Sequence, residues 1–346
     1  MNLKEELQSI LKGEVADDGA TLARYSRDAS LFEVKPRLVV FPQDVQDIKN
    51  LVSFVSQHPE ERLSLTCRGG GSDMTGGPLS ESIVLDMTRY FNRIKEIGED
   101  FALVEPGVFY RDFEKETAKR NLLLPCFPAS KDLCTLGGMV ANNAGGELTL
   151  RYGKTEDYVE QLKVVCSDGN EYVVQPLTRI ELDAKVAQND FEGQIYKKIS
   201  ELVQAHEELL NNAKPKVSKN SAGYFLWDVH DKNKETFNLA RLFIGSQGTL
   251  GVITEIRFKL VSQTTHSSLL VVFLKDQSLL AEVTQAILRE KPESFEMYDD
   301  HTLKLAARFF LDFLTTLKGN VFSLGLRFLP EFLMLLKGGV PKLILL

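Results

Sequence analysis

The sequence is poor in cysteine and lacks the cysteine pairs that hold metals or form redox disulfides. Its four cysteines, Cys67, Cys126, Cys134 and Cys166, never occur at C-x-x-C spacing, and its five histidines are scattered. A structural zinc site needs clustered cysteine and histidine ligands, so the sequence predicts no metal site. We expect four reduced and mostly buried thiols.

Long runs of basic residues are also absent. The chain has 41 Lys and Arg against 48 Asp and Glu, a formal net charge of −7, which argues against nucleic acid as a partner. An acidic protein that binds an anionic ligand must do so with locally placed donors rather than through a general positive field.

Neither end of the chain predicts a membrane span or a signal peptide. Residues 1–18 are typical of the start of an amphipathic helix, because charges interrupt every apolar stretch. The apolar residues 325–346 are broken by two prolines and by charged side chains such as Arg327 and Glu331. We expect a cytoplasmic protein, with peripheral association at a membrane as the alternative.

What the sequence does contain is a regular succession of strand and helix patterns. The predicted strands are apolar or alternating and span residues 36–42, 63–67, 82–86, 101–105, 163–167 and 171–174. The last two flank Asp168-Gly169, a strong hairpin signal. The predicted helices span residues 45–55, where Asp44 can act as the cap, and residues 110–120 and 195–212.

The character of the chain changes after Val261. A strand near residues 267–274, a helix near Leu279–Glu290 and a helix near Thr302–Leu317 predict the start of a second α/β unit. A length of 346 residues suits two domains. The last residues, PKLILL, are typical of the opening of a strand, so we expect a chain that stops before the enzyme is complete.

The most informative segment is the glycine-rich loop Arg68–Gly77, directly after a predicted strand. Glycines turn successive backbone N–H groups toward one point, because positive φ values cost them little. Such a nest binds a pyrophosphate without lysines, and Arg68 could add a charge-assisted contact. The alternative is a mobile surface loop.

Two familiar phosphate-binding motifs fail on spacing. The dinucleotide motif G-x-G-x-x-G needs a glycine where Met74 stands, and the P-loop that Gly153-Lys154-Thr155 could end needs a glycine where Leu148 stands. The usual dinucleotide and nucleoside triphosphate folds are therefore disfavoured.

Two further glycine-rich segments, Phe127–Gly169 and Ile244–Ile256, complete an ordered set of three motifs. Together they resemble the FAD-binding domain of the vanillyl-alcohol oxidase superfamily, most of all its D-lactate dehydrogenase and glycolate oxidase flavoprotein-subunit group. The resemblance implies an α+β fold with a two-subdomain PCMH-type FAD-binding domain and then an incomplete ferredoxin-like α/β cap domain. We expect an N-terminal helical segment at 1–35, the FAD-binding domain at 36–262 and the start of the substrate or cap domain at 263–346.

The resemblance implies contacts with FAD from all three motifs. The residues that would wrap the pyrophosphate are Arg68, Gly69, Gly70, Gly71, Ser72, Gly76 and Gly77. The turn that would lie along the cofactor contributes Pro128, Ala129 and Ser130. The residues that would pack on the ribityl and pyrophosphate portion, unless they only make tight turns, are Thr135, Gly137, Gly138, Asn142 and Gly145. The residues that would close over the adenosine side are Gly248, Thr249 and Ile253. The family more often carries Glu at the position of Gln247.

Two more features bear on how the flavin is held. Lys219–Tyr224 resembles an element near the flavin edge in this family, so Lys219 would stabilise a reduced, anionic flavin, unless it is an exposed structural lysine. Relatives that bind FAD covalently use a histidine of the first loop. Here the loop has Ser72 and Asp73 instead. We expect noncovalent FAD.

The implied activity is oxidation of a 2-hydroxy acid of the D-lactate, glycolate or D-2-hydroxyglutarate type, by hydride transfer to the flavin. The partners would be that small substrate and an electron acceptor, which is a quinone, a cytochrome, an electron-transfer flavoprotein or a partner subunit. The catalytic and metal-binding histidines of relatives lie in later segments that have no counterpart here, so no catalytic residue is assigned. The alternatives are another oxidase of the superfamily, acting on an alditol, a sugar acid or a lipid precursor, and a non-catalytic FAD-binding fragment.

Overall fold

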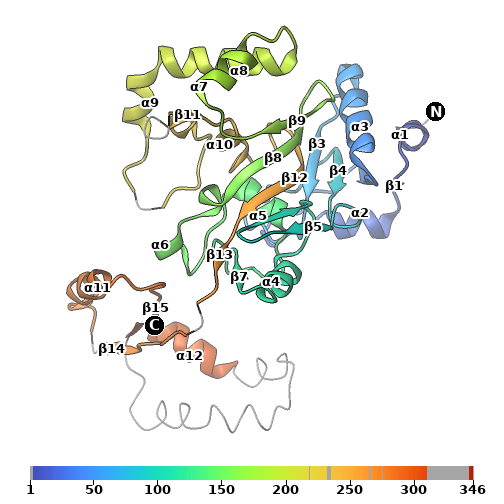
Figure 1. Cartoon of the computed structure of the whole chain (residues 1–346). Coiled ribbons are helices and arrows are strands. Elements are labelled where there is room, and N and C mark those ends of the chain that lie inside the picture. The colour runs from blue at the N-terminus through green and yellow to red at the C-terminus, as the bar shows by residue number, and fades with distance from the viewer. Residues whose placement is uncertain are drawn as a thin grey trace. The chain divides into compact units, whose positions relative to one another are not determined.

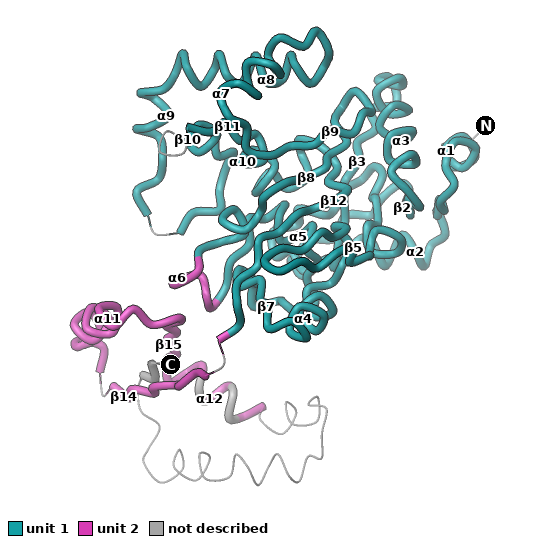
Figure 2. Tube along the Cα trace, in the orientation of Figure 1, with its two compact units in different colours: residues 1–146, 153–263 teal, residues 147–152, 264–346 magenta. Residues whose placement is uncertain are grey.

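The computed structural model of the chain describes residues 3–217, 219–231, 235–264, 266–274, 276–309 and 343–345. It divides into two compact units, residues 1–146 with 153–263 and residues 147–152 with 264–346 (Figure 2). The chain thus leaves the first unit at residue 147, returns to it at 153 and leaves again at 264. The last departure lies beside residue 262, where the sequence changes character.

The first unit begins with a four-stranded sheet in the order β1-β2-β4-β3 (Figure 1). Its strands are β1 (Glu14–Ala16), β2 (Leu38–Phe41), β3 (Leu65–Arg68) and β4 (Ile83–Asp86). Strands β2 and β3 both run parallel to β4, and β1 is antiparallel to β2. Every residue of β2 and β4 is buried, as expected of strands covered on both faces. The strands predicted at 36–42, 63–67 and 82–86 are confirmed.

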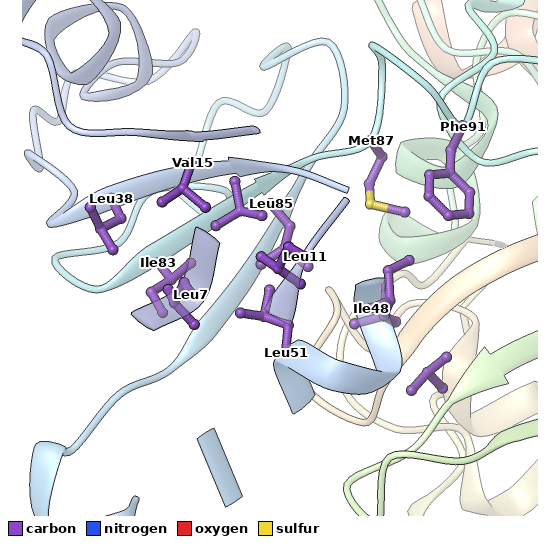
Figure 3. Packing of buried hydrophobic residues seen from close by; sticks show 13 residues of the cluster. Leu7, Leu11, Val15, Leu38, Ile48, Leu51, Ile83, Leu85, Met87 and Phe91 are labelled. Carbon is purple, nitrogen blue, oxygen red and sulfur yellow. The ribbon is translucent and has the colours of Figure 1, made fainter. Parts of the chain in front are cut away.

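Helix α3 (Val45–Gln57) covers this sheet and builds its main core (Figure 3). The Asp44 side chain accepts a hydrogen bond from the Asp47 backbone N–H, so the predicted N-cap is confirmed. Ile48 and Leu51 are fully buried and pack against Ile83 and Leu85 of the sheet. The remaining members of the buried cluster are Leu7, Leu11, Val15, Leu38, Val40, Met87, Phe91, Val165 and Val252.

The N-terminal segment belongs to the same layer. Helix α1 (Leu3–Ile10) contributes Leu7 to the core, and β1 forms an edge of the sheet. Helix α2 (Gly19–Tyr25) is capped by Asp18. Residues 1–35, expected as a helical segment, therefore also supply a strand.

A five-stranded antiparallel sheet in the order β5-β6-β12-β8-β9 forms the second layer of the unit. Its strands are β5 (Ile94–Ile97), β6 (Phe101–Val104), β8 (Val159–Val165), β9 (Glu171–Val174) and β12 (Val252–Lys259). The predicted hairpin is confirmed, because β8 pairs with β9 and Gly169 adopts a positive φ of 79° in its turn. Figure 1 shows β8 and β12 side by side.

Shorter elements connect these strands. They are η1 (Pro59–Glu61), α4 (Tyr110–Ala118), β7 (Leu122–Leu123), α5 (Leu136–Asn142), η2 (Thr155–Asp157) and β13 (Val261–Ser262). Between β9 and β12 come α7 (Arg179–Val186), α8 (Phe191–Ala205), α9 (Glu207–Ala213), η3 (Leu226–Asp228), β10 (His230–Asp231), β11 (Thr236–Phe237) and α10 (Ala240–Phe243).

The helix predicted over residues 195–212 is two helices. They meet at His206, whose φ of −121° and ψ of 25° are not helical. The apolar pattern continues through this residue, so periodicity alone could not reveal the break.

The second unit has a three-stranded antiparallel sheet in the order β14-β16-β15. Its elements are α6 (Thr149–Tyr152), β14 (Val272–Leu274), α11 (Leu280–Arg289), β15 (Met297–Asp299), α12 (Asp300–Arg308) and β16 (Leu343–Leu345). The helix predicted at Thr302–Leu317 is seen as α12, and its residues after 309 lie outside the described part. No helix in the described ranges is long and apolar enough to cross a bilayer.

Candidate cofactor site

Three bends of the first unit, distant in the sequence, line one cavity of about 360 Å³. The first bend is residues 67–78, the second is residues 128–146 and the third is residues 244–249. The lining residues are Cys67, Gly69, Gly70, Gly71, Ser72, Asp73, Met74, Thr75, Gly77, Pro78, Pro128, Ser130, Cys134, Thr135, Gly138, Met139, Ala141, Asn142, Ala144, Gln247 and Gly248. The volume is in the range of about 300–1,000 Å³ that small-molecule sites occupy.

The first two bends touch through bare glycine backbone. A Cβ added at Gly70 would lie 2.0 Å from the carbonyl oxygen of Leu133, and one added at Gly69 would lie 2.1 Å from Oγ1 of Thr135. Any side chain at these two positions would push the bends apart. Gly71 adopts a positive φ of 67°, which other residues rarely accept.

The backbone amides of Gly70, Gly71 and Ser72 have no hydrogen-bond acceptor among the described residues. All three residues line the cavity. Consecutive free N–H groups at a glycine-rich bend form a nest that can bind an anion.

Arg68 does not line the cavity, although the sequence suggested a contact with the pyrophosphate. Its guanidinium lies buried, donates to the backbone carbonyls of Tyr25 (3.3 Å) and Arg27 (2.6 Å), and stacks on the Tyr25 ring. The side chain therefore supports the first bend from behind. The sequence could not show this, because the acceptors are backbone carbonyls.

Residues 25–34, here called the strap, support the outer side of the first bend. The Ala29 N–H donates to the carbonyl of Gly71 (3.1 Å), and the Phe32 ring covers Gly76, where an added Cβ would lie 2.9 Å from it. Gly76, with a φ of 86°, thus faces the strap and does not line the cavity.

Helix α5 forms the core of the second bend. The Thr135 side chain caps it by accepting the N–H of Gly138 (3.3 Å). The N–H of Gly137 donates to the Pro106 carbonyl, and a Cβ there would meet Pro106 at 2.5 Å. Gly137 is therefore a packing glycine, whereas Gly138 and the exposed Asn142 line the cavity.

The third bend is fastened to the end of α5. The N–H groups of Gly245 and Gln247 donate to the carbonyls of Val140 and Ala141, both at 2.9 Å. Gln247 (φ 53°) and Gly248 (φ 77°) are left-handed, and both line the cavity. Thr249 lies outside the lining, where its Oγ1 contacts the Tyr224 hydroxyl (2.7 Å).

The remaining expected contact residues do not line the cavity. Ile253 is paired with Val164 inside the second sheet, Ala129 is exposed, and Gly145 is half-buried. The sequence did not single out several residues that do line the cavity, among them Cys67, Asp73, Met139 and Ala144. For Asp73 a signal exists, because the Asp-x-Thr spacing favours the turn in which its Oδ1 accepts Thr75 N–H.

None of the lining residues is lysine, arginine or histidine, and Asp73 is the single charged one. Burial raises the pKa of the Cys67 and Cys134 thiols to about 12, so both stay neutral at physiological pH. The lining residues can thus hold a phosphate only through neutral donors, which are backbone N–H groups, hydroxyls and the side-chain amides of Asn142 and Gln247. Across the residues that the structure describes, no cluster of three or more His, Cys, Asp or Glu side chains is arranged to hold a metal ion.

Residues 36–175 match the family model of the FAD binding domain. The match runs from just before β2 to the end of β9 and includes the first two bends. This segment is an FAD binding domain. The expectation of FAD as the cofactor is thereby confirmed. The first two bends lie inside the matched segment and the third bend lies after it, and all three meet at the cavity.

Two curated relatives agree with the expected family. The chain is 32% identical to D-2-hydroxyglutarate dehydrogenase of Escherichia coli over 261 residues, which cover 74% of this chain and 26% of that protein. It is 28% identical to glycolate oxidase subunit GlcD of Bacillus subtilis over 310 residues, which cover 87% of this chain and 54% of the relative. The chain therefore spans about a quarter of the first relative and about half of the second.

A solved structure shows the same fold. Alkyldihydroxyacetonephosphate synthase superposes with a TM-score of 0.66 at 18% identity, covering 99% of this chain and 54% of that one. At this identity the likeness concerns the fold alone. The predicted α+β class with a PCMH-type FAD binding domain is confirmed.

Proposed function

We propose that this chain is the FAD-binding part of a flavin-dependent dehydrogenase or oxidase that acts on the CH–OH group of a 2-hydroxy acid. The observation that carries the proposal is the convergence of three bends on one cavity inside an FAD binding domain. The names of the two relatives support a substrate of the D-2-hydroxyglutarate or glycolate type. The proposed domain order is an N-terminal segment at residues 1–35, the FAD-binding domain at 36–262 and the start of the substrate or cap domain at 263–346.

The residues of the cavity fit the phosphate part of FAD. The glycines at 69 and 70 let the first and second bends approach each other closely, and the three amides at 70–72 have no acceptor among the described residues. We propose that these amides hold the pyrophosphate, with Ser130 and Asn142 contributing side-chain hydrogen bonds. Gly248 would allow close approach from the third bend.

The chemistry of hydride acceptance comes from FAD when it is bound. What this chain supplies is a cavity whose lining residues include no cation, so that neutral donors would bind the diphosphate. The residues that line the cavity include no Lys, Arg or His that could bind the carboxylate of a substrate. The catalytic residues and the electron acceptor therefore stay unassigned. The location in the cell, cytoplasmic or peripheral at a membrane, also stays a prediction.

We propose that FAD is held noncovalently. No histidine lines the cavity, and its two cysteines are neutral thiols with a pKa of about 12. Denaturation should release all the flavin into the supernatant. Flavin that stays with the precipitated protein would show a covalent bond.

The activity is tested with the purified chain reconstituted with FAD. Retention of a flavin absorbance spectrum after gel filtration is expected. Anaerobic addition of D-lactate, glycolate and D-2-hydroxyglutarate then measures which acid bleaches the flavin. A colourless protein after reconstitution would refute FAD binding. Bleaching by an alditol or sugar acid but by none of the three acids would favour another oxidase of the superfamily, and a yellow protein that no donor bleaches would favour a non-catalytic fragment.

A further inference from the structure

The loop Lys219–Tyr224 is largely exposed, yet three separate hydrogen bonds connect it to the rest of the first unit. The buried Lys154 ammonium donates to the backbone carbonyl of Asn220. The Ser221 hydroxyl donates to the carbonyl of Asn143 (3.2 Å). The Tyr224 hydroxyl pairs with Oγ1 of Thr249 (2.7 Å). Exposed loops are usually mobile, and these three hydrogen bonds limit the conformations that this loop can adopt.

Two anchors of the loop, Asn143 and Thr249, stand next in sequence to residues that line the FAD cavity. Asn143 stands between Asn142 and Ala144, which both line the cavity. It is the left-handed residue that ends α5, with a φ of 49° and no exposed surface. Thr249 directly follows Gly248, which lines the cavity from the third bend. The loop is thus tied to the second and third bends at the same time.

Lys154 is the least expected of the anchors, because lysine is rarely buried. Its side chain is 7% exposed and lies 3.6 Å from the Glu156 carboxylate, 3.5 Å from the Ser221 hydroxyl and 5.3 Å from the centre of the Phe225 ring. Burying an ammonium costs free energy unless it is paired and hydrogen-bonded. A neutral side chain would fill this space at a lower cost in desolvation free energy, so packing alone does not explain why a charged residue stands here.

We propose that Lys154 is a positioning residue that holds the loop 219–224 and thereby keeps the second and third bends of the FAD cavity in place before the cofactor binds. Its ammonium holds the carbonyl of Asn220, and the loop in turn bonds Asn143 of the second bend and Thr249 of the third. The proposal rests on the proposed function, since the ligand of the cavity is FAD. It adds a role for a residue that does not itself line the cavity.

Asn143 and Glu156 complete the arrangement. The Asn143 side chain donates to the Glu156 carboxylate (2.9 Å) and accepts the Glu156 N–H (3.1 Å), while Arg241 approaches the same carboxylate at 3.9 Å. Burial raises the pKa of Glu156, and Lys154, Asn143 and Arg241 oppose that rise. Removing Lys154 would therefore leave Glu156 less compensated, and any test must separate this effect from the loss of the loop anchor.

The test uses the full chain with Lys154→Met and Lys154→Arg, and Lys214→Met as the matched control. Lys214 is an exposed lysine that pairs with Asp228 and does not contact the loop. Hydrogen exchange of the amides of residues 220–224 is measured without FAD, and the FAD dissociation constant is measured by flavin fluorescence. We expect Lys154→Met to raise both the exchange rates and the dissociation constant about 10-fold, because a local opening free energy is lost. Lys154→Arg should restore both, and Lys214→Met should change neither.

A double-mutant cycle sharpens the test. Tyr224→Phe should weaken FAD binding in the wild-type background but add little to Lys154→Met, because both changes release the same loop. If Lys154→Met fails to fold, Lys154→Met/Glu156→Gln is compared with Glu156→Gln alone, which removes the unpaired carboxylate from the comparison.

Unchanged exchange of residues 220–224 in Lys154→Met would overturn the proposal, as would a loosened loop with unchanged FAD affinity. Failure of Lys154→Arg to restore either quantity would also count against it. These outcomes differ from failure of the proposed function, which would appear as wild-type protein that binds no FAD.

Discussion

The first bend and helix α5 line the same cavity but keep their shapes by different means. The first bend is held from outside itself, by the Arg68 guanidinium on two backbone carbonyls and by the strap residues Ala29 and Phe32. Helix α5 has its own caps, Thr135 at the N-terminus and the left-handed Asn143 at the C-terminus, in addition to bonds from its first amides to Val108 and Pro106. A glycine-rich bend has little structure of its own, because glycine loses much conformational freedom on folding.

This difference bears on why the backbone N–H groups without acceptors lie in the first bend and not in α5. The first amides of α5 are already satisfied, by Val108, Pro106 and the Thr135 side chain. The amides at 70–72 have no acceptor in the described part of the chain. We therefore propose that the first bend, which has support from elsewhere, binds the anion, and that α5 contributes mainly close packing. Breaking the support of each region should have different consequences.

Gly70→Val should have the largest effect. The new Cβ would lie 2.0 Å from the Leu133 carbonyl oxygen, so the first and second bends must separate. We expect FAD affinity to fall by more than about 100-fold, equivalent to about 2.7 kcal/mol. Gly19→Val is the control, since no heavy atom lies within 4 Å of a Cβ added there. A Gly70→Val protein that stays yellow at wild-type stoichiometry would contradict the assignment of this bend.

Arg68→Met tests the support from behind. It leaves the carbonyls of Tyr25 and Arg27 without their donor, and hydrogen bonds to charged groups are worth about 1.5–3 kcal/mol each. We expect a lower free energy of unfolding and an FAD affinity that is about 10-fold weaker or more. Phe32→Ala, which removes the ring that covers Gly76, should lower both quantities as well. The double variant should be less than additive, because both changes release the strap.

The salt dependence separates the two roles of Arg68. A guanidinium that bound the pyrophosphate directly would make the FAD affinity of the wild type fall steeply with ionic strength, and Arg68→Met would remove that slope. A guanidinium that only supports the bend leaves the slope unchanged. If Arg68→Met removed the dependence of FAD affinity on ionic strength, the direct contact between Arg68 and the pyrophosphate that the sequence suggested would be supported after all.

Several of these features were predictable from the sequence. The second and third bends were assigned to the site through the resemblance to a known family. The strands at 38–41 and 83–86 are continuous apolar runs, the Asp168-Gly169 turn is a local signal, and the glycine run of the first bend indicates an unusual backbone conformation. Each of these properties resides in neighbouring residues, so local pattern was sufficient.

The partners of Arg68, Gly137 and Lys154 were not predictable. Each side chain or N–H bonds a backbone carbonyl that is distant in the sequence, and a carbonyl is the same in every residue type. The break at His206 was hidden for a related reason, since the apolar period runs on through it. Long-range contacts to the backbone leave no mark that a motif could carry.

Thr135→Val probes the internal support of α5 with a side chain of nearly the same shape. It removes the N-cap bond to Gly138, and loss of a cap costs about 1 kcal/mol of stability. Because α5 supplies no free amides, we expect the cost to appear in thermal or urea unfolding, with FAD affinity changed only about 3-fold or less. An affinity loss as large as that of Arg68→Met would erase the distinction between the two regions.

Gln247→Glu should have the smallest effect and reports on charge at the meeting point of the first and third bends. A Cβ at Gly77 would lie 3.0 Å from Oε1 of Gln247 and 3.4 Å from Oδ2 of Asp73, so these two side chains flank the same glycine. The substitution restores the residue more usual in the family but places a second carboxylate beside Asp73 and the diphosphate. We expect FAD affinity to fall only about 2-fold at low ionic strength and to recover with added salt, because exposed charges are screened. Tighter FAD binding by Gln247→Glu would mean that the glutamate of relatives serves the cofactor directly, and that the third bend, like the first, supplies binding rather than packing.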